Sequence, residues 1–515
     1  MDKEKITELE SLKGKSKEGG GAERIAAQHQ RGKLTARERI ALLFDKGTFE
    51  EIEPLSVHRC VDFNMAGNTY PGDSVVVGYG QVDGRACFAA SQDFTVLGGS
   101  LSEVASQKIC KVMDMAATTG APFVAILDSG GARIQEGIDS LNGYGEIFTR
   151  NTLYSGVIPQ ISVIVGPTAG GAVYSPAITD FVLMVKGIGQ SYITGPEVVE
   201  AVTGEKVSLE ALGGASVNST RSGNCHFLYE NEEDCFLGVR RLLSYLPQSN
   251  REKPAVMECK DSIDRREEGI LDIMPDNSSQ AYDMKKIILK IIDDADFLEV
   301  HQRFACNFIT GFARLGGESI GILAQQPSFM AGVLDIDASD KAARFVRTCD
   351  CFNIPLITFV DVPGYMPGTD QEYRGIIRHG AKLLFAYAEA TVPKISVITR
   401  KAYGGAYIAM SSKSLRGDIN FAWPTAEIAV MGPEAAVNFV YRREIKEAKN
   451  LEETKQKLTA EYREKFATPY MAAARGYIDD VIDPRDTRLR LIKALQVLKN
   501  KEITNPYKKH GNIPL

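Results

Sequence analysis

Two pairs of adjacent glycines stand in apolar stretches of this 515-residue chain, Gly170-Gly171 in GPTAGGAVYS and Gly404-Gly405 in RKAYGGAYIAM. Glycine is unfavourable inside a helix or strand, because it loses the most conformational freedom on folding. At a turn from a strand into a helix, it lets a ligand approach the free N–H groups of the first helical turn. Such amides stabilise an oxygen atom that becomes negative during a reaction, and removing one costs roughly 3–4 kcal/mol. The pattern favours a main-chain oxyanion hole over the alternative that the glycines only allow close packing.

A second glycine turn precedes each pair, in DSGGARIQEG (128–137) and DVPGYMPGTD (361–370). Two turns side by side would direct two N–H groups at one oxygen atom, as an oxyanion hole requires. Pro363 has no N–H group, so Gly364 or Tyr365 must donate in the second half. Two such holes in one chain suggest that two carbonyl groups are handled in one reaction.

No side-chain catalyst stands out in the sequence. The six histidines lie in no motif typical of a metal or nucleophile site. Ser129 lacks the G-x-S-x-G elbow of a serine nucleophile, and His379 in GIIRHGAK is more typical of a helix residue than of a base. We therefore expect the chemistry to come from main-chain amides.

The glycine turns belong to a unit that occurs twice in the chain. Matching residues recur at an offset of 233 or 234 positions: Gln92 with Gln325, Lys108 with Lys341, Asp128 with Asp361, and Gly170 with Gly404. Identical short words in the same order at nearly constant spacing indicate a duplication. We expect two homologous domains, residues 1–260 and 261–515, joined by the polar stretch 248–269.

Each half has the same predicted order of elements. A strand pair is followed by a helix, around 102–119 in the first half and 338–352 in the second. A β-branched strand then ends in the first glycine turn, and a second helix and strand lead to the glycine pair. Alternating strands and helices indicate α/β layers, in which ligands bind at the ends of strands.

The composition argues against several classes of protein. A net charge of −6 and a pI near 5.8 do not favour a general nucleic-acid surface. Nine scattered cysteines without a CxxC pair offer no zinc ribbon and no disulfide framework.

The N-terminal stretch lacks the apolar core of a signal peptide, so the cytosol is the expected compartment. Residues 161–185 could span a membrane by length, but their prolines, glycines and Asp180 favour a buried strand, turn and helix.

Longer words around these turns carry a resemblance over nearly the whole chain. They are SQDFTVLGGSLSE (91–103), DSGGARIQEG, AGGAVYSPAITDF (169–181), ITGPEVV (193–199), the stretch 361–394, RKAYGGAYIAM, AWPTAEIAVMGPEAA (422–436) and the final KKHGNIPL. These words resemble the biotin-dependent acyl-CoA carboxyltransferases, a family that includes propionyl-CoA carboxylase β chains and methylmalonyl-CoA decarboxylase α chains.

The resemblance implies a fold and a different ligand for each of the two holes. The fold is α/β, a tandem of duplicated crotonase-like (ClpP/crotonase) domains, and the assembly is a hexamer with each site between two subunits. One hole would hold the thioester carbonyl of an acyl-CoA, and the other the ureido oxygen of biotin. We expect the first hole to face the thioester, and the sequence leaves the opposite assignment open. Carried over by position, the first hole consists of Gly131, Ala132, Gly170 and Gly171, and the second of Gly364, Tyr365, Gly405 and Ala406.

Further contacts are implied for the two ligands. The segment RGKLTARERI offers cations for the CoA phosphates, although a solvated helix face is an equal alternative. Ile408 would line a pocket for a short acyl chain, and the stretch 312–345 matches the acyl-CoA-contacting region. The implied ligand-binding residues are Arg31, Lys33, Arg37, Gly404, Ile408, Gln325 and Lys341.

The chain has no M-K-M biotin attachment word and no ATP-binding domain, so biotin is expected on a separate carrier protein. No metal and no nucleic acid are expected. The reaction moves CO2 between carboxybiotin and the α-carbon of propionyl-CoA or a similar thioester. The partner would set its direction: a biotin carboxylase subunit for carboxylation, or a membrane sodium-pump subunit for decarboxylation. A crotonase-like hydratase or thioesterase is a more distant alternative, and a non-enzymatic scaffold is a third.

Overall fold

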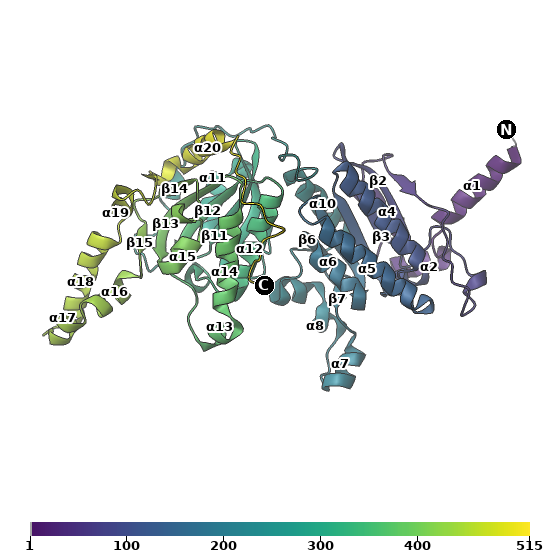
Figure 1. Cartoon of the computed structure of the whole chain (residues 1–515), viewed down its shortest axis with the longest axis horizontal. Coiled ribbons are helices and arrows are strands. Elements are labelled where there is room, and N and C mark those ends of the chain that lie inside the picture. The colour runs from purple at the N-terminus through teal and green to yellow at the C-terminus, as the bar shows by residue number, and fades with distance from the viewer. Residues whose placement is uncertain (1–2) are drawn as a thin grey trace. The chain divides into compact units, whose positions relative to one another are not determined.

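The computed structural model describes residues 3–515, which fold into two compact units. The first unit ends at Lys253 and the second spans Pro254–Leu515, so the division falls within the polar stretch 248–269. Each unit contains one eight-stranded sheet with helices packed against it (Figure 1).

In the first unit the sheet order is β1-β2-β3-β4-β5-β6-β8, and β7 pairs with the far end of β5. The β1–β2–β3 pairings are antiparallel, and all the others are parallel. Its strands are β1 (Glu50–Ile52), β2 (Val75–Val82), β3 (Arg85–Gln92), β4 (Phe123–Ser129), β5 (Gln160–Ala169), β6 (Phe181–Val185), β7 (Gln190–Tyr192) and β8 (Phe227–Tyr229). Its helices are α1 (Lys3–Lys17), α2 (Ala22–Gln30), α3 (Ala36–Leu43), α4 (Glu103–Thr119), α5 (Ile138–Leu153), α6 (Tyr174–Ile178), α7 (Pro196–Thr203), α8 (Leu209–Gly213), α9 (Ala215–Val217) and α10 (Glu232–Tyr245).

The second unit repeats this topology with the order β9-β10-β11-β12-β13-β14-β16, and β15 pairs with β13. Its strands are β9 (Leu298–Val300), β10 (Phe308–Leu315), β11 (Glu318–Gln325), β12 (Leu356–Val362), β13 (Lys394–Tyr403), β14 (Ile419–Ala422), β15 (Glu427–Ala429) and β16 (Asp480–Val481). Its helices are α11 (Met284–Ile291), α12 (Ile336–Cys351), α13 (Thr369–Arg374), α14 (Ile376–Glu389), α15 (Gly404–Ala409), α16 (Pro433–Val440), α17 (Arg442–Glu447), α18 (Leu451–Phe466), α19 (Pro469–Ala474) and α20 (Thr487–Leu498).

The two helices predicted from the sequence start at side-chain caps. Ser102 accepts a hydrogen bond from the N–H of Ala105 and begins α4, and Asp335 does the same for Ala338 at α12. Gly120 ends α4 in the left-handed conformation. The apolar run 161–185 contains a strand, a turn and a helix as expected, and it ends in a further strand, β6, which was not predicted. However, β5 extends to Ala169, and the helix after the glycines is only a short 3-10 turn, η4 (Gly170–Val173), followed by α6.

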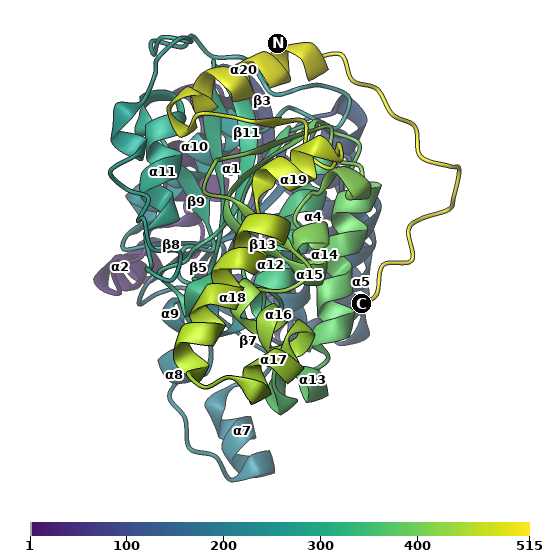
Figure 2. The ribbon, with the colours of Figure 1, turned by 90° about the vertical axis from the view of Figure 1, so that its left-hand side faces the viewer.

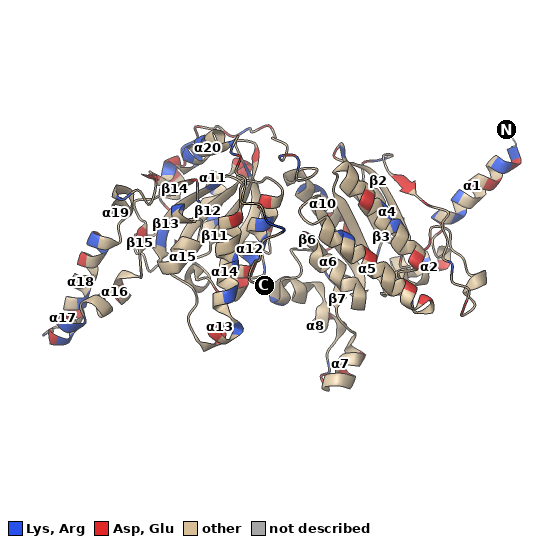
Figure 3. Ribbon diagram, in the orientation of Figure 1, with Lys and Arg blue, Asp and Glu red and all other residues tan. Residues whose placement is uncertain are grey.

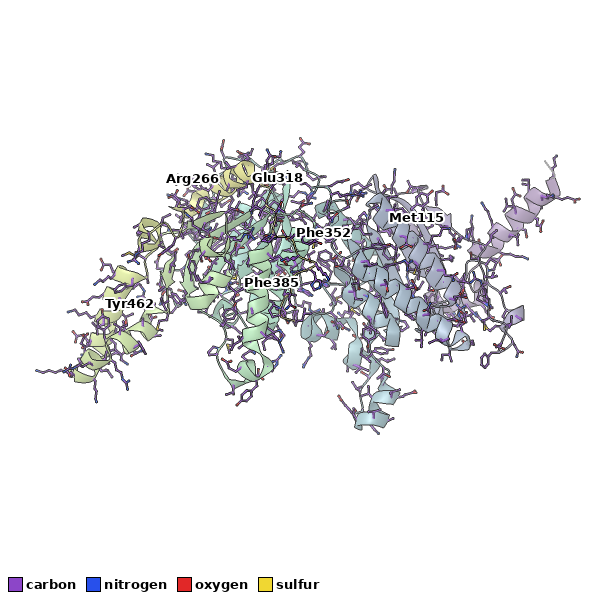
Figure 4. The ribbon with its side chains drawn as sticks, in the orientation of Figure 1. Met115, Arg266, Glu318, Phe352, Phe385 and Tyr462 are labelled. Carbon is purple, nitrogen blue, oxygen red and sulfur yellow. The ribbon has the colours of Figure 1, made fainter. Side chains whose placement is uncertain are left out.

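The central parallel strands lie in the buried core of each unit. Strands β4 and β12 are buried along their whole length, which agrees with their mostly apolar sequences. The helices α4 and α5 pack side by side against the first sheet, and α12 and α14 against the second (Figure 1). Met115 of α4, labelled in Figure 4, is partly buried against the first core, and Trp423 is fully buried in the second.

Helices α16, α17 and α18 contact one another and form a lobe beside β15 that Figure 2 shows face on. Within α18, the ring centroids of Tyr462, labelled in Figure 4, and Phe466 are 5.0 Å apart. Acidic and basic residues are both scattered over the two units, without a large surface of one sign in this view (Figure 3). No helix among residues 3–515 is both long enough and apolar enough to cross a membrane.

Candidate active site

The first glycine turn lies at the carboxyl end of β4. Gly131 has φ +98°, and its N–H donates to Ser129 Oγ at 3.0 Å. Its carbonyl accepts from Leu101 N at 2.9 Å, and Arg133 N donates to the Leu101 carbonyl at 3.0 Å. Within residues 3–515 the N–H of Ala132 has no acceptor. The turn therefore fixes one free amide between two that are already bonded.

The second turn of this unit follows β5, the strand next to β4. Gly170 has φ +61°, and its N–H donates to the Ile193 carbonyl at 3.0 Å. Gly171, the next residue of η4, has its N–H free, as expected in the first turn of a helix. A Cβ atom on Gly131 would lie 3.2 Å from the Ala169 carbonyl oxygen, so the two turns are in contact. The amides of Ala132 and Gly171 thus form a pair at one edge of the sheet.

The second unit has the same two turns at equivalent positions. Leu334 N donates to the Gly364 carbonyl at 3.0 Å, and Met366 N donates to the Leu334 carbonyl at 2.8 Å. These bonds bracket Tyr365 as their counterparts bracket Ala132. Gly404 has φ +58° and begins α15, whose first-turn amides at Gly405 and Ala406 are unpaired.

The structure therefore brings together the eight residues predicted to form the holes, four in each unit, and refines their roles. In the first hole only Ala132 and Gly171 have free N–H groups, because those of Gly131 and Gly170 are bonded within the fold. These two glycines supply the positive φ angles instead. Gly405 is exposed, and a Cβ atom there would meet nothing within 4 Å. Space is thus available above this amide for a ligand.

The cations predicted to bind CoA phosphates fall into two groups. Arg31 lines a groove of about 320 Å³ together with Arg24, Phe94 and Gly98. Gly98 also accepts the N–H of Gly130 at 2.9 Å, so this groove reaches the first turn.

Lys33 and Arg37 are bound within the first unit. Lys33 is 7% exposed, and its Nζ atom lies 2.6 Å from Asp128 Oδ1, while Arg37 makes two hydrogen bonds to Glu51. Burial lowers the pKa of Lys33 in spite of the attraction of Asp128. The Lys33 ammonium group is thus enclosed and already paired with Asp128, and these contacts give no support to its predicted role at a CoA phosphate. Arg24, which the sequence analysis did not single out, lines the groove beside Arg31, and its guanidinium group donates to the Tyr70 hydroxyl at 3.2 Å and to the Thr95 carbonyl at 3.3 Å. Its spacing of seven residues from Arg31, two helical turns, was an available signal.

Lys341 and Gln325 were also predicted to contact a ligand, and both lie in the interior. Lys341 Nζ donates to the carbonyls of His301, Phe304 and Phe308 at 2.9, 2.8 and 2.6 Å. Burial lowers the pKa of this lysine to about 8. Gln325 is fully buried, and its Oε1 accepts the N–H of Asp361 at 3.0 Å. Lys341 therefore holds the segment 301–308 in place, and Gln325 holds the end of β12, both from buried positions.

The remaining side chains at the second hole are apolar or neutral. Ile408 lies in α15 and is 36% exposed, three residues after Gly405. Burial raises the pKa of Tyr365 to about 12, and its hydroxyl donates to the Gly380 carbonyl at 3.3 Å. In residues 3–515, no three His, Cys, Asp or Glu side chains gather closely enough to hold a metal ion. The chemistry available at both turns is hydrogen-bond donation to an oxygen atom.

Comparison with known proteins gives a family match over most of the chain. Residues 27–513 match the family model of the carboxyl transferase domain. The methylmalonyl-CoA decarboxylase subunit alpha of Propionigenium modestum is 56% identical over 512 residues, 99% of each chain. The mitochondrial propionyl-CoA carboxylase beta chain of Homo sapiens is 56% identical over 499 residues, 96% of this chain and 91% of that one.

A solved structure of the transcarboxylase 12S hexamer, with methylmalonyl-coenzyme A bound, superimposes with a TM-score of 0.97 at 50% identity. The alignment covers 99% of this chain and 98% of that one. The predicted fold class, tandem crotonase-like α/β domains, is confirmed by this likeness and by the duplicated topology.

Proposed function

The chain belongs to the carboxyl transferase family, and on this basis we propose that it transfers a carboxyl group between biotin on a carrier protein and the α-carbon of a short-chain acyl-CoA. The observation that carries the proposal is the duplicated pair of free amides at adjacent strand ends, one pair in each unit. It agrees with the names of the relatives, which are propionyl-CoA carboxylase beta chains and methylmalonyl-CoA decarboxylase alpha subunits. The hydratase and thioesterase alternatives gain no support.

In this proposal the first hole takes the thioester. The amides of Ala132 and Gly171 donate to its carbonyl oxygen and stabilise the negative charge that develops when the α-proton leaves. The groove of Arg24 and Arg31 supports the assignment, because it reaches the first turn through Gly98 and offers two cations to phosphate groups. Both turns stand at the ends of buried strands, so little motion is needed to align the donors.

The second hole then serves the ureido oxygen of biotin. Its neutral N–H donors, from Tyr365 and from the start of α15, suit an uncharged oxygen that gains negative charge. Carboxybiotin, when bound, supplies the carboxyl group and afterwards a nitrogen atom that accepts the acyl α-proton. Ile408, near the free amides of α15, presents an apolar side chain that suits a short alkyl group. The roles of these individual residues remain predictions.

The partner chains are part of the proposal. A biotin carrier protein is required, because the sequence has no biotin attachment word. A biotin carboxylase subunit would drive carboxylation, and a membrane pump subunit would use the reverse reaction. A homo-hexamer is proposed from the likeness to the transcarboxylase 12S core. A cytosolic location stays a prediction.

The test uses the purified chain with methylmalonyl-CoA and free biotin, and follows the formation of propionyl-CoA by chromatography. We expect formation that depends on biotin, with lower rates for malonyl-CoA and ethylmalonyl-CoA. Formation that is absent, or that is equally fast without biotin, would contradict the proposal. Co-purification of a biotin carboxylase or of a membrane subunit from the native cell would give the direction.

A further inference from the structure

A buried carboxylate lies directly before the first glycine turn in each unit. Asp128 is the penultimate residue of β4, and Asp361 is the penultimate residue of β12. Both side chains are fully buried. The free amides of Ala132 and Tyr365 follow these carboxylates by four residues. An ionised carboxylate is costly to bury, so each must be held by specific partners.

In the first unit the partners of Asp128 come from the N-terminal segment. Its carboxylate accepts from Lys33 at 2.6 Å, from Arg39 at 2.8 Å and from Gln28 at 3.0 Å. Burial acts to lower the pKa of Arg39, but the charges and hydrogen bonds of Asp128 and Glu232 outweigh it, and the pKa is raised. The segment 28–39 is thereby tied to the end of β4.

In the second unit the partner of Asp361 comes from the neighbouring strand. Arg400 Nε lies 3.0 Å from Asp361 Oδ2, and the N–H of Lys401 donates to Oδ1 at 3.1 Å. Arg400 is held in turn by the Gln280 carbonyl at 2.6 Å and by the ring of Tyr282, 4.8 Å from its guanidinium carbon. The cation that pairs with Asp361 therefore occupies a different position in the fold from those that pair with Asp128.

The duplication shows which part of the cluster was kept. Position 400 corresponds to Gly166 at the offset of 234. A Cβ atom on Gly166 would lie 1.8 Å from Asp128 Oδ1, so no side chain fits there and the cations must come from elsewhere. The carboxylate is kept in both halves, as is the glutamine (Gln92, Gln325) that accepts its backbone N–H. The cation was replaced, so the common element is a charged anchor at the strand end.

The backbone of each carboxylate residue is also clamped from its other side. A Cβ atom on Gly99, in η2 (Leu97–Gly99), would lie 2.1 Å from the Asp128 carbonyl oxygen. The equivalent distance from Gly332 to the Asp361 carbonyl oxygen is 3.0 Å. The ion pair and this close backbone contact together fix the point from which the turn departs.

We infer that Asp128 and Asp361 are positioning residues, which hold the free amides of the first and second holes in register through their buried ion pairs. The inference rests on the proposed function. Neither carboxylate needs to touch the substrate, because each acts through the turn that follows it. A displacement of about 1 Å at such a site can lower the rate about 100-fold.

The test replaces each carboxylate by its neutral isostere, Asp128→Asn and Asp361→Asn. All the side-chain partners of Asp128 are donors, so an amide NH2 group would face a donor and the turn would shift. The matched control is Asp293→Asn. Asp293 is also buried, at 5% exposure, pairs with Arg488 at 2.6 Å, and accepts hydrogen bonds from the N–H groups of Gly316 and Gly317, but none of these partners belongs to a glycine turn of the site.

We expect kcat per folded protein, with methylmalonyl-CoA and free biotin, to fall about 10- to 100-fold in both site variants. Hydrogen exchange should accelerate in the turns 129–133 and 362–366 respectively. In Asp361→Asn the KM for the thioester should change less than kcat, because this variant leaves the groove of the first unit untouched; Gln28, a partner of Asp128, lines that groove. Asp293→Asn should lower stability but keep kcat within about threefold.

Milder variants keep the inference testable if an asparagine variant does not fold. Gln28→Met removes the hydrogen bond that the uncharged Gln28 amide donates to Asp128, and Arg400→Lys keeps the positive charge beside Asp361. Each should give a smaller loss of kcat with local exchange at the same turn. If the site variants that fold behave like Asp293→Asn, with lost stability and unchanged kcat, the inference is wrong. Inactivity of the unaltered chain would instead overturn the proposed function.

Discussion

The variant Gly405→Val tests whether the second oxyanion hole is needed for activity, because we expect it to lower kcat without a large loss in the free energy of unfolding. Gly405 is exposed, its φ is not in the left-handed region, and a Cβ atom there would meet nothing within 4 Å. The fold therefore accommodates valine, and the cost in stability should not exceed the roughly 0.5–1 kcal/mol typical of a surface helix position. The added methyl groups, however, occupy the space in which an oxygen atom must approach the amide to about 2.7–3.1 Å.

The expected loss is that of one hole donor, about 100- to 1,000-fold in kcat, or about 2.7–4 kcal/mol. The comparison variant is Gly404→Ala. Gly404 has φ +58°, and its Cβ atom would lie 3.0 Å from the Val430 carbonyl oxygen, so alanine is strained there. That variant should lose about 1–2 kcal/mol of stability. The neutral control is Gly14→Val in α1, where equally nothing lies within 4 Å.

The assay measures kcat per folded protein with methylmalonyl-CoA and free biotin, beside thermal unfolding of the same samples. Gly171→Val is the matching change in the first hole, where the Tyr144 ring would be at an ordinary contact distance of 3.5 Å. If Gly405→Val and Gly171→Val both keep full activity, the account of two main-chain holes is wrong. Activity lost only in proportion to unfolded protein would refute it equally.

Three further outcomes follow from the structure. The pKa of Lys341 is about 8 in the fold against 10.5 in the unfolded chain, so between these pH values the unfolded chain binds more protons than the native one. The free energy of unfolding of the native chain, relative to that of Lys341→Met, should therefore rise with pH in this window by up to about 1.4 kcal/mol per pH unit, and stay constant below pH 8. Urea titrations at a fixed protein concentration measure this difference. Arg24→Ala combined with Arg31→Ala should raise KM for the CoA thioester about tenfold or more with little change in kcat, and a KM that does not move would remove the groove from the CoA site. Ile408→Trp should lower kcat/KM for ethylmalonyl-CoA more than for malonyl-CoA, and equal effects on both would show that this residue does not sense the acyl chain.

Much of the architecture could be predicted because its signals are local. Strands β4 and β12 are mostly apolar runs, α4 and α12 begin at Ser102 and Asp335 caps, and glycines mark the turns between strand and helix. The nearly constant offset of 233 or 234 positions between matching residues predicted that the two units would have the same topology. Turn residues and periodicity report the conformation of their own segment, so these features follow from short stretches of sequence.

The sequence by itself determined where main-chain donors would lie and that there would be two sets of them. Only the tertiary structure decided which amides are free, since the N–H of Gly170 is taken by Ile193, 23 residues away, and that of Gly131 by the folded-back hydroxyl of Ser129. It also decided that the Lys33 ammonium group pairs with Asp128, 95 residues along the chain. A side chain's charge is read from its type, but its partner is set by which distant segments the fold places within hydrogen-bond distance.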